Sequence, residues 1–470
     1  MAVKMVKIGI EKTKTSENEN KAAVLPQCVA VIIANLGAFM IGTCRGWSST
    51  SEFALTQREE CGFPVSIRQF SWVGSLMPVG CIVGASPLTG WLVTHLGRRT
   101  TMTIVAVPSA VGYAMMAYAQ NVPMLCIGRL LTGIGAGGYG VTIPLYVAEL
   151  ASTNIRGRLG VVFQTIITFG ILFTYVVGSL VTSFWLSFLC TLIPIVHGLM
   201  VFFIPESPIY YLQKNKDEEA KAALQWFRGS EYNIDEEFSR KKKDIEEAKA
   251  LKLTIYEAFS SKSAKKGLLI CMGVMFFRQF SGASGIIFYN NVIFQEAGSS
   301  LSPNLQTILM GVTDLTTTCL SSTVVDRLGR RPLLLFSDFA MSICTFFIGA
   351  FFFMKDRDYD VSYITWVPVT FLCTFCLAYS SGFGPLPWVL LGEIFPRRIA
   401  GYAASIVCMF NFFWVFIVTR YFEDISYAIG REWVFFFFSA CSAVGVVFVY
   451  CVVPETKKKT VEDILKELEM

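Results

Sequence analysis

Twelve apolar segments, each long enough to cross a membrane, are the feature that most constrains this chain. A helix needs roughly 20 predominantly apolar residues to span the hydrocarbon core. The strands of a membrane barrel would alternate apolar and polar side chains over about ten residues, whereas these runs are continuous. The sequence therefore predicts an all-α polytopic membrane protein with spans near 27–47, 69–94, 100–119, 122–147, 159–181, 183–204, 266–294, 304–325, 332–354, 363–391, 400–421 and 433–453.

Composition supports this prediction and narrows the function. Of the 470 residues, 53% are hydrophobic and 16% are charged, whereas a soluble protein carries roughly 25% charged residues. Two histidines leave no room for a histidine-rich metal site, and a net charge of +5 is too small to indicate nucleic-acid binding. No catalytic constellation and no G-x-x-x-x-G-K-S/T nucleotide loop occurs. We therefore expect no enzyme, no cofactor, no metal and no nucleic acid, but a monomer whose partners are the lipid bilayer and a small-molecule substrate.

The basic residues predict how the chain is oriented. Cytosolic loops carry an excess of Lys and Arg, so the N-terminus is assigned to the side that gathers most of them. This assignment puts both termini in the cytosol, and we expect a multi-pass protein of the plasma membrane. The basic residues on that side are Arg98, Arg99, Arg156, Arg158, Arg327, Arg330, Arg331, Arg397, Arg398 and Lys457 to Lys459.

The chain is predicted to divide into five parts. A cytosolic tail, 1–26, precedes a six-helix bundle at 27–204. Residues 205–265 mix charges of both signs in Ala-rich and Lys/Glu-rich stretches, which predicts a cytosolic segment of short amphipathic helices; a flexible linker is the alternative. A second six-helix bundle at 266–453 is followed by a cytosolic tail at 454–470.

Short motifs recur at matching places in the two bundles. Gly-Arg-Arg at 97–99 recurs at 329–331, and Pro-Glu followed by a hydroxyl residue occurs at 205–207 and again at 454–456. Glu149 ends the fourth span as Glu393 ends the tenth. Two six-helix halves in the same orientation are a transporter architecture, with the binding site between the halves near the midplane.

These motifs and others, in order along nearly the whole chain, resemble those of the sugar porter family of the major facilitator superfamily. The short outer loop after span one, the run at 71–77 and Ile287-Phe288-Tyr289 resemble those of insect facilitated trehalose transporters more than those of vertebrate glucose transporters. The motifs are Gly128-Arg129-Leu130, Glu149 through Arg156-Gly157-Arg158, Pro205-Glu206-Ser207-Pro208, Gln279-Phe280-Ser281-Gly282, Asp326-Arg327-Leu328-Gly329-Arg330-Arg331, Gly384-Pro385-Leu386-Pro387-Trp388 and Pro454-Glu455-Thr456-Lys457.

Opposite charges cluster at the cytosolic mouth of each half. Such charges at the ends of packed helices can form a network that breaks and reforms as the halves rock; the alternative is that they only anchor helix ends and set topology. The resemblance implies that this network closes the cytosolic gate in the outward-open state. The residues are Arg98, Arg99, Glu149, Arg156 and Glu206 in the first half, and Arg330, Arg331, Glu393, Arg397 and Glu455 in the second.

The resemblance also implies a central sugar site. Amides and hydroxyls suit such a site because each bonds a sugar hydroxyl, and an aromatic face supports the ring. Buried polar groups left unpaired cost roughly 1–3 kcal/mol each, which is how such a site rejects a wrong ligand. By motif position the contacts fall on Gln164, Arg278, Gln279, Ser284, Asp314, Trp388 and Asn411.

Two glycine-rich breaks interrupt otherwise long spans, at 281–285 and at 382–387. Proline removes a backbone hydrogen bond and glycine favours a kink, so the half-helices can bend toward a ligand. Helix packing through small residues is the alternative. The residues we expect to act in gating are Phe288, Tyr289, Gly384, Pro385 and Pro387.

The energy source is predicted from the first span. Proton-coupled members of the family carry an Asp there that faces the arginine of the fourth span. Cys44 stands at that position here, opposite Arg129, and it cannot serve as that carboxylate. We therefore expect facilitated diffusion, and the leading interpretation is a facilitative (uniport) carrier of a sugar such as trehalose or a hexose, working by alternating access.

Charges in the predicted cavity depart from the family pattern. Arg278 stands for a usual Gln, Asp314 and Ser284 for Asn, and Arg45 for a small polar residue. An ionised side chain in the membrane costs roughly 2.5–3.5 kcal/mol on insertion scales, so each should have a partner or a purpose. We expect Arg278 and Asp314 to pair across spans seven and eight.

Two other functions stay open. Arg45 and Arg129 have no obvious carboxylate in the first half, which would suit a carrier of an anionic or polar non-sugar metabolite. A non-transporting nutrient sensor on the same fold is the other alternative.

Overall fold

The computed structural model describes residues 23–469 apart from 57–59, 61, 153–154, 251–260, 299–300, 396, 458 and 460. Within helices, the side chains of 156–158, 244, 247–250, 322–327, 397–401 and 461–462 also lie outside the description. The predicted tail at 1–26 therefore falls almost entirely outside the described residues. Throughout the described ranges the regular structure is helical.

The first half of the chain contributes helices α2 to α8. Ser86 caps α4 by accepting a hydrogen bond from the backbone N–H of Leu88 at 3.3 Å, and Pro87 is the first helical residue. Because proline has no N–H, it is well suited to the first position of a helix, and α3 and α4 meet at a bend of 47°. The elements are α2 (Val24–Thr56), α3 (Ile67–Gly84), α4 (Pro87–Leu96), α5 (Arg98–Ala117), α6 (Val122–Leu150), α7 (Arg156–Leu180), α8 (Ser183–Met200) and the 3₁₀ helix η1 (Val201–Phe203).

Short helices follow the first half: α9 (Pro208–Gln213), α10 (Asp217–Arg228) and α11 (Asp235–Ala250). Arg228 of α10 is buried and donates to both carboxylate oxygens of Glu237 at 2.8 and 2.9 Å. It also donates to the carbonyl of Leu150 at 2.8 Å. This arginine fixes α10 and α11 to the end of α6.

The second half repeats the pattern with helices α13 to α20, and α21 follows it. Its elements are α13 (Lys262–Phe280), α14 (Ala283–Ala297), α15 (Pro303–Leu328), α16 (Arg330–Asp356), the 3₁₀ helix η2 (Ser362–Ile364), α17 (Val367–Ser381), α18 (Leu386–Ile394), α19 (Arg397–Ile429), α20 (Arg431–Val452) and α21 (Val461–Glu469).

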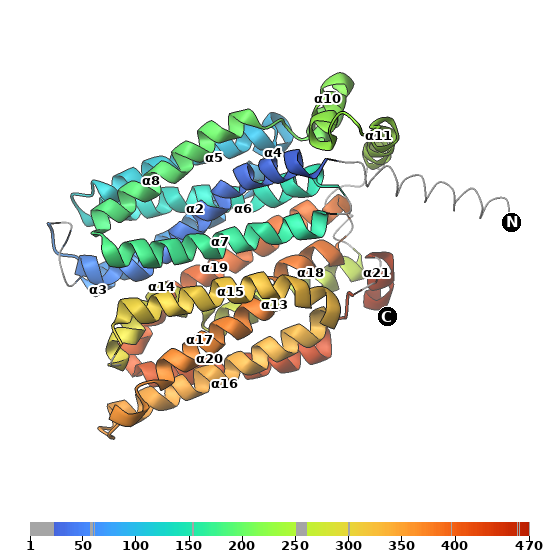
Figure 1. Ribbon diagram of the computed structural model, residues 1–470. Coiled ribbons are helices and arrows are strands. Elements are labelled where there is room, and N and C mark those ends of the chain that lie inside the picture. The colour runs from blue at the N-terminus through green and yellow to red at the C-terminus, as the bar shows by residue number, and fades with distance from the viewer. Residues whose placement is uncertain are drawn as a thin grey trace.

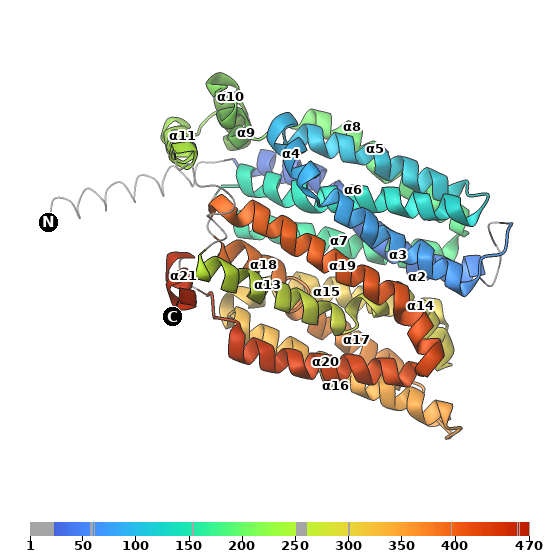
Figure 2. The same cartoon turned by 180° about the vertical axis from the view of Figure 1, so that it is seen from behind.

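The helices bear out the predicted polytopic fold. In the described residues, 10 stretches are long and apolar enough to span a membrane, and the bent α3–α4 pair brings the number to 11. The remaining predicted span lies in α15, where the side chains of 322–327 fall outside the described residues. The N-half, α2 to α8, and the C-half, α13 to α20, lie side by side as two layers (Figures 1 and 2).

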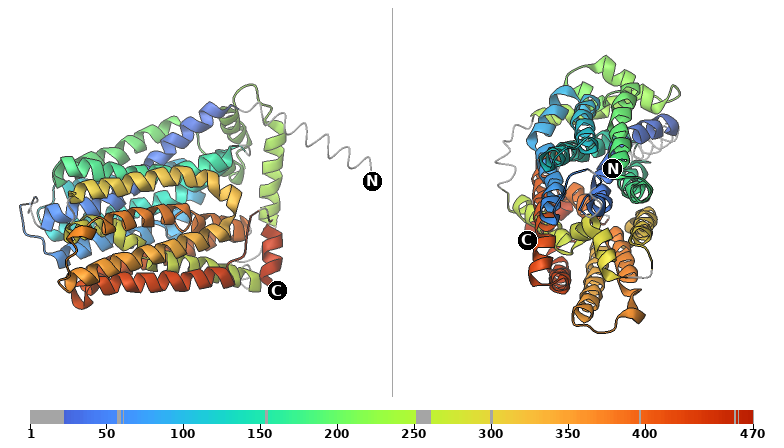
Figure 3. Two further views of the ribbon diagram at one scale, coloured as in Figure 1. Left: turned by 60° about the horizontal axis from the view of Figure 1, so that its bottom comes forward. Right: turned by 90° about the vertical axis from the view of Figure 1, so that its left-hand side faces the viewer.

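The two ends of the bundle differ. Helices α10, α11 and α21 gather at one end, where α2 also begins (Figures 1 and 3). We call this the linker end, and the opposite end, where α2 passes to α3 and α19 passes to α20, the loop end.

The two halves are packed differently. In the N-half, glycines let helix backbones touch: a Cβ added at Gly80 of α3 would collide with the backbone oxygen of Leu130 in α6, and Gly133 shows the same from the α6 side. In the C-half, a Cβ added at Gly273 of α13 would instead meet the ring of Phe448 in α20. A ring can shift where a packed backbone cannot, so the N-half interfaces are the less deformable ones.

Candidate functional site

A polar cluster forms where α13 breaks into α14. Gly282 connects the two helices with φ at +91°, a left-handed conformation that glycine adopts without strain. The break places the end of α13 and the start of α14 against α19. Asn411 of α19 is fully buried, and its Oδ1 accepts from Nη1 of Arg278 at 3.1 Å and from Nε2 of Gln279 at 2.7 Å.

Gln279 extends the cluster to Ser284, whose hydroxyl donates to its Oε1 at 2.5 Å. Nδ2 of Asn411 is buried and has no partner among the described residues. Buried polar groups are almost always bonded, so this orphan donor marks a place where a ligand hydroxyl could bond. The structure thus brings four of the predicted contacts, Arg278, Gln279, Ser284 and Asn411, into one network.

The second break, between α17 and α18, supplies further partners of Arg278. The run Gly384-Pro385-Leu386-Pro387 leaves the carbonyl of Phe383 outside any helix, and this carbonyl accepts from Nε of Arg278 at 3.0 Å. Nη2 donates to the Tyr379 hydroxyl. The guanidinium carbon lies 5.7 Å from the ring centroid of Trp388, so Trp388 also faces the cluster.

The predicted ion pair between Arg278 and Asp314 is wrong. Asp314 of α15 instead accepts a hydrogen bond from Ser380, the residue after Tyr379 on α17. Neighbouring residues of one helix thus hold the two charges apart, and all three guanidinium nitrogens of Arg278 have other acceptors.

In the N-half, Cys44 does face Arg129, as predicted. Nη1 of Arg129 lies 2.8 Å from the carbonyl oxygen and 3.7 Å from Sγ of Cys44. Nη2 donates to Ser48 at 2.7 Å, and the ring of Trp47 lies under the guanidinium. Ser48 and Trp47 were not among the residues predicted from the sequence, although their spacing of four and three residues from Cys44 puts them on the same helix face.

Two predicted contacts form no hydrogen bond with the cluster. Gln164 of α7 and Arg45 of α2 are both half-buried, and neither side chain is hydrogen-bonded to the residues of the C-half network. Arg45 forms no hydrogen bond or ion pair within the described part of the chain.

The halves are bonded to each other at the loop end. Ser49 of α2 donates to Oδ1 of Asn290 in α14, and Nδ2 of Asn290 donates to the Tyr175 hydroxyl of α7 at 3.0 Å. Ser71 of α3 donates to the carbonyl of Arg420 in α19 at 2.7 Å. Every hydrogen bond between the halves that joins described residues lies at this end, so the loop end is closed.

The predicted gating aromatics lie just beneath these contacts. Phe288 and Tyr289 of α14 are buried. The Tyr289 hydroxyl donates to the carbonyl of Thr419 at 2.7 Å, and its ring stacks on Phe422 at 11°. Ser49, Tyr175 and Asn290 were not predicted from the sequence. The available signal was the polar pair Asn290-Asn291 in an otherwise apolar span.

At the linker end, charged side chains pair within each half. Nη2 of Arg98 lies 2.7 Å from Glu149, and Nη2 of Arg330 lies 2.9 Å from Glu393. The side chains of Arg156 and Arg397, also expected in these clusters, lie outside the described residues. In the described residues no ion pair of this set crosses between halves.

Glu206 and Glu455 act as matching caps. The Glu206 carboxylate accepts from the backbone N–H groups of Arg98 and Arg99, both at 2.9 Å. Glu455 accepts from those of Arg330 and Arg331, both at 3.1 Å. A carboxylate at a helix N-terminus is stabilised by these unpaired donors and by the helix dipole.

The two caps differ in pKa direction. Burial raises the pKa of Glu206 above its ordinary value despite the N–H groups that bond it. Burial also acts on Glu455, but the N–H groups of Lys457, Arg330 and Arg331 outweigh it and lower its pKa.

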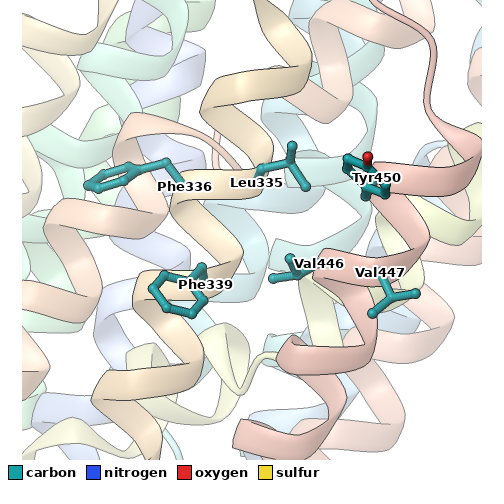
Figure 4. A pocket seen from close by; sticks show the side chains of 6 residues that line it. All are labelled: Leu335, Phe336, Phe339, Val446, Val447 and Tyr450. Carbon is teal, nitrogen blue, oxygen red and sulfur yellow. The ribbon is translucent and has the colours of Figure 1, made fainter.

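Two hollows lie away from the polar cluster. An apolar groove of about 450 Å³ lies between α16 and α20 on their exposed sides (Figure 4), lined by Leu335, Phe336, Phe339, Val446, Val447 and Tyr450. A polar cavity of about 560 Å³ lies at the loop end between α2, α7, α14 and α15; its lining includes Thr50, Glu60, Asn291, Gln295 and Asn304.

Comparison with known proteins agrees with this geometry. A family model described as "Sugar (and other) transporter" matches residues 22–468. The chain is 36% identical over 458 residues to the facilitated trehalose transporter Tret1 of Culex quinquefasciatus, covering 97% of this chain and 88% of that protein. It is 37% identical to the facilitated trehalose transporter Tret1-2 homolog of Drosophila simulans, covering 94% and 91%. The chain spans about half the length of some other relatives, such as 56% of the Aedes aegypti Tret1.

The fold matches solved structures. A partially occluded inward-open conformation of the xylose transporter XylE from E. coli superposes with a TM-score of 0.77 at 24% identity, covering 92% of this chain and 99% of that chain. The inward-open conformation of XylE superposes with a TM-score of 0.76 at 23% identity, covering 93% of this chain and 98% of that chain. This chain is therefore a multi-pass membrane protein of the sugar porter family of the major facilitator superfamily.

Proposed function

We propose that this chain is a facilitative carrier that moves a sugar, such as trehalose or a hexose, across the membrane by alternating access. The observation that carries the proposal is the network of Gln279, Ser284 and Asn411, in which neutral amides and a hydroxyl are gathered beside Trp388. These groups suit sugar hydroxyls and a sugar ring. The names of the insect relatives support trehalose as one candidate substrate.

The contacts between the halves support alternating access. Hydrogen bonds join the halves at the loop end, whereas the described ion pairs of the linker end stay within each half. A carrier needs two such states, one closed at each end. We propose that the linker end faces the cytosol, that both termini lie there, and that the protein works in the plasma membrane.

Uniport is proposed from the N-half. Arg129 is held by the carbonyl and sulfur of Cys44 and by the hydroxyl of Ser48, none of which is a carboxylate. No carboxylate of the described residues pairs with this arginine, so a proton has no counter-charge to neutralise there. Transport is then driven by the sugar gradient alone.

The test is uptake of labelled trehalose and labelled glucose into vesicles that contain the purified full chain. Sugar is expected to equilibrate to equal concentrations inside and outside, and a protonophore is expected to change nothing. Accumulation above the external concentration that the protonophore abolishes would contradict uniport. Absence of uptake of both sugars would contradict the sugar-carrier proposal.

A matched pair of variants tests the site. Asn411→Leu leaves donors of Arg278 and Gln279 unpaired, a cost of about 1–3 kcal/mol, and is expected to reduce uptake roughly tenfold or more. Asn304→Ala removes an exposed amide of the loop end that bonds Asn291 within the C-half and is expected to leave uptake nearly unchanged. Equal uptake by both variants would exclude the cluster as the sugar site.

A further inference from the structure

Arg45 lies on the face of α2 that is turned toward the C-half. It precedes Ser49 by four residues, and residues four apart share a helix face. Ser49 bonds Asn290 of α14, so this face meets the other half. The charge of Arg45 also acts on Arg278 of α13 and on Asp314 of α15. The guanidinium group is therefore placed between the halves, beside the polar cluster.

Arg45 differs from the other arginines of this region because none of its guanidinium nitrogens donates to a described residue. Nε, Nη1 and Nη2 of Arg278 all donate to acceptors in the C-half. Those of Arg129 are directed at Val73, Cys44 and Ser48. A guanidinium carries five N–H donors, and those of Arg45 bond no described residue.

Charge at this level of the membrane is not balanced by the described residues. The acceptors of Arg129 and Arg278 are neutral. Two acidic groups are set against the three guanidinium groups: Asp314, whose carboxylate is bonded by Ser380, and Asp338, which is buried on α16 beside Gly445. A neutral sugar can bond these groups but cannot neutralise them. An unneutralised charge in the membrane is costly, so a ligand that brings a negative charge has an added reason to bind.

We propose that the central site takes a sugar that carries an oxyanion, a carboxylate or a phosphate, and that Arg45 binds this group. The planar fork of a guanidinium can bond both oxygens of such a group at once. Gln279, Ser284 and Asn411 then bond the sugar hydroxyls, and Trp388 supports the ring. The inference rests on the proposed carrier function and names the substrate class of the same site.

The first test compares sugars that share a ring. Vesicles of phosphatidylcholine containing the full chain are loaded with unlabelled probe, and counterflow of labelled D-glucose, D-glucuronate and D-glucose 6-phosphate is measured. At least one of the two anions is expected to move about tenfold faster than glucose, since one charge-assisted contact is worth at least about a tenfold preference. The anion that moves faster distinguishes a carboxylate from a phosphate ligand.

Variants of Arg45 locate the selectivity. Arg45→Gln removes the charge and is expected to lower the anion-to-glucose transport ratio about tenfold. Arg45→Lys keeps the charge but lacks the planar fork, so its ratio is expected to lie between those of Arg45→Gln and the unaltered protein. Arg357→Gln removes the same charge at the exposed end of α16 and is expected to leave the ratio unchanged. An Arg45→Gln ratio within about twofold of the unaltered protein would overturn the inference.

A second measurement separates this inference from the proposed function. The thermal unfolding midpoint of the unaltered protein in detergent is recorded with each probe, and the anion is expected to raise it more than glucose does. Movement of glucose or trehalose without either anion would overturn the oxyanion site and leave the sugar carrier standing. If no probe moves, the carrier proposal fails, and an anion that raises the midpoint no more than glucose overturns the oxyanion site as well.

Discussion

The loop end and the linker end of the bundle hold their polar side chains in different ways. At the loop end, Ser49, Asn290 and Tyr175 bond across the two halves. At the linker end, Arg98 with Glu149 and Arg330 with Glu393 each pair within one half. The loop-end bonds therefore hold the halves together in this conformation, whereas the linker-end pairs hold each half in shape.

The largest expected effect is the loss of unfolding free energy when the acidic partner of a linker-end ion pair is removed. The side chains of Arg98 and Glu149 are 5% and 10% exposed, whereas those of Arg330 and Glu393 are 14% and 28% exposed. Glu149→Ala leaves a buried guanidinium without its counter-charge, so it is expected to lower the free energy of unfolding by about 3 kcal/mol. Glu393→Ala is expected to cost about 1 kcal/mol because water reaches that pair.

Unfolding in detergent, followed by a probe of helix loss, measures both variants. Spin-label distances between the halves should stay unchanged in either of them. A Glu149→Ala variant that opened the loop end, or that cost no more than Glu393→Ala, would break the comparison between the two ends.

The next effect concerns the bonds across the loop end. Asn290→Ala removes the acceptor of Ser49 and a donor to Tyr175, and leaving buried partners unpaired costs about 1–3 kcal/mol. The population open at the loop end should therefore rise roughly 5- to 150-fold. Pulsed electron paramagnetic resonance, with labels on both halves at that end, measures the shift. Asn304→Ala is the control, because Asn304 bonds Asn291 within the C-half at the same end. This variant should leave the label distances between the halves unchanged.

The smallest expected effect is a difference in pH dependence between the two carboxylate caps of the linker end. A carboxyl with a raised folded pKa, such as Glu206, binds its proton more tightly when folded, so its contribution to stability improves as pH falls from neutral toward the ordinary value of 4.5. Glu455 has a lowered pKa, so its contribution is present above 4.5 and is lost as pH falls through its folded pKa.

Unfolding midpoints measured between about pH 7 and pH 3 test these opposite pH dependences. Each carboxyl is expected to change the free energy of unfolding by less than about 1.4 kcal/mol for each unit by which its pKa is shifted. Glu206→Gln should remove a gain in stability on acidification, and Glu455→Gln should remove a loss. Two variants that change the pH dependence in the same direction would show that the difference in burial between the caps has no energetic consequence.

Much of the fold could be predicted from the sequence because spans and motifs are local features. Apolar length predicts a helix wherever the bilayer must be crossed. Motif order placed Cys44 opposite Arg129, since a helix face is set by spacing alone. Span α15 is recognisable by its place in the repeat.

The site was less predictable because it depends on how separate helices lie. Arg278 and Asp314 were expected to pair from motif position, but the helix break frees the carbonyl of Phe383 for Arg278, while Ser380 takes the carboxylate. Side-chain direction at a broken helix is not contained in spacing. The bonds of Ser49 and Asn290 also require the relative placement of the two halves, which no local pattern specifies.

The glycine contacts of the two halves determine which substitutions each half can accept. At Gly80 any larger residue would push against the backbone oxygen of Leu130, so neither α3 nor α6 can change there without moving the other. At Gly273 the opposing atoms belong to the ring of Phe448, and a smaller residue at 448 would make room for a larger one at 273. A substitution at Gly273 can therefore be compensated by a second one at Phe448, whereas a substitution at Gly80 has no side chain opposite it that could make room.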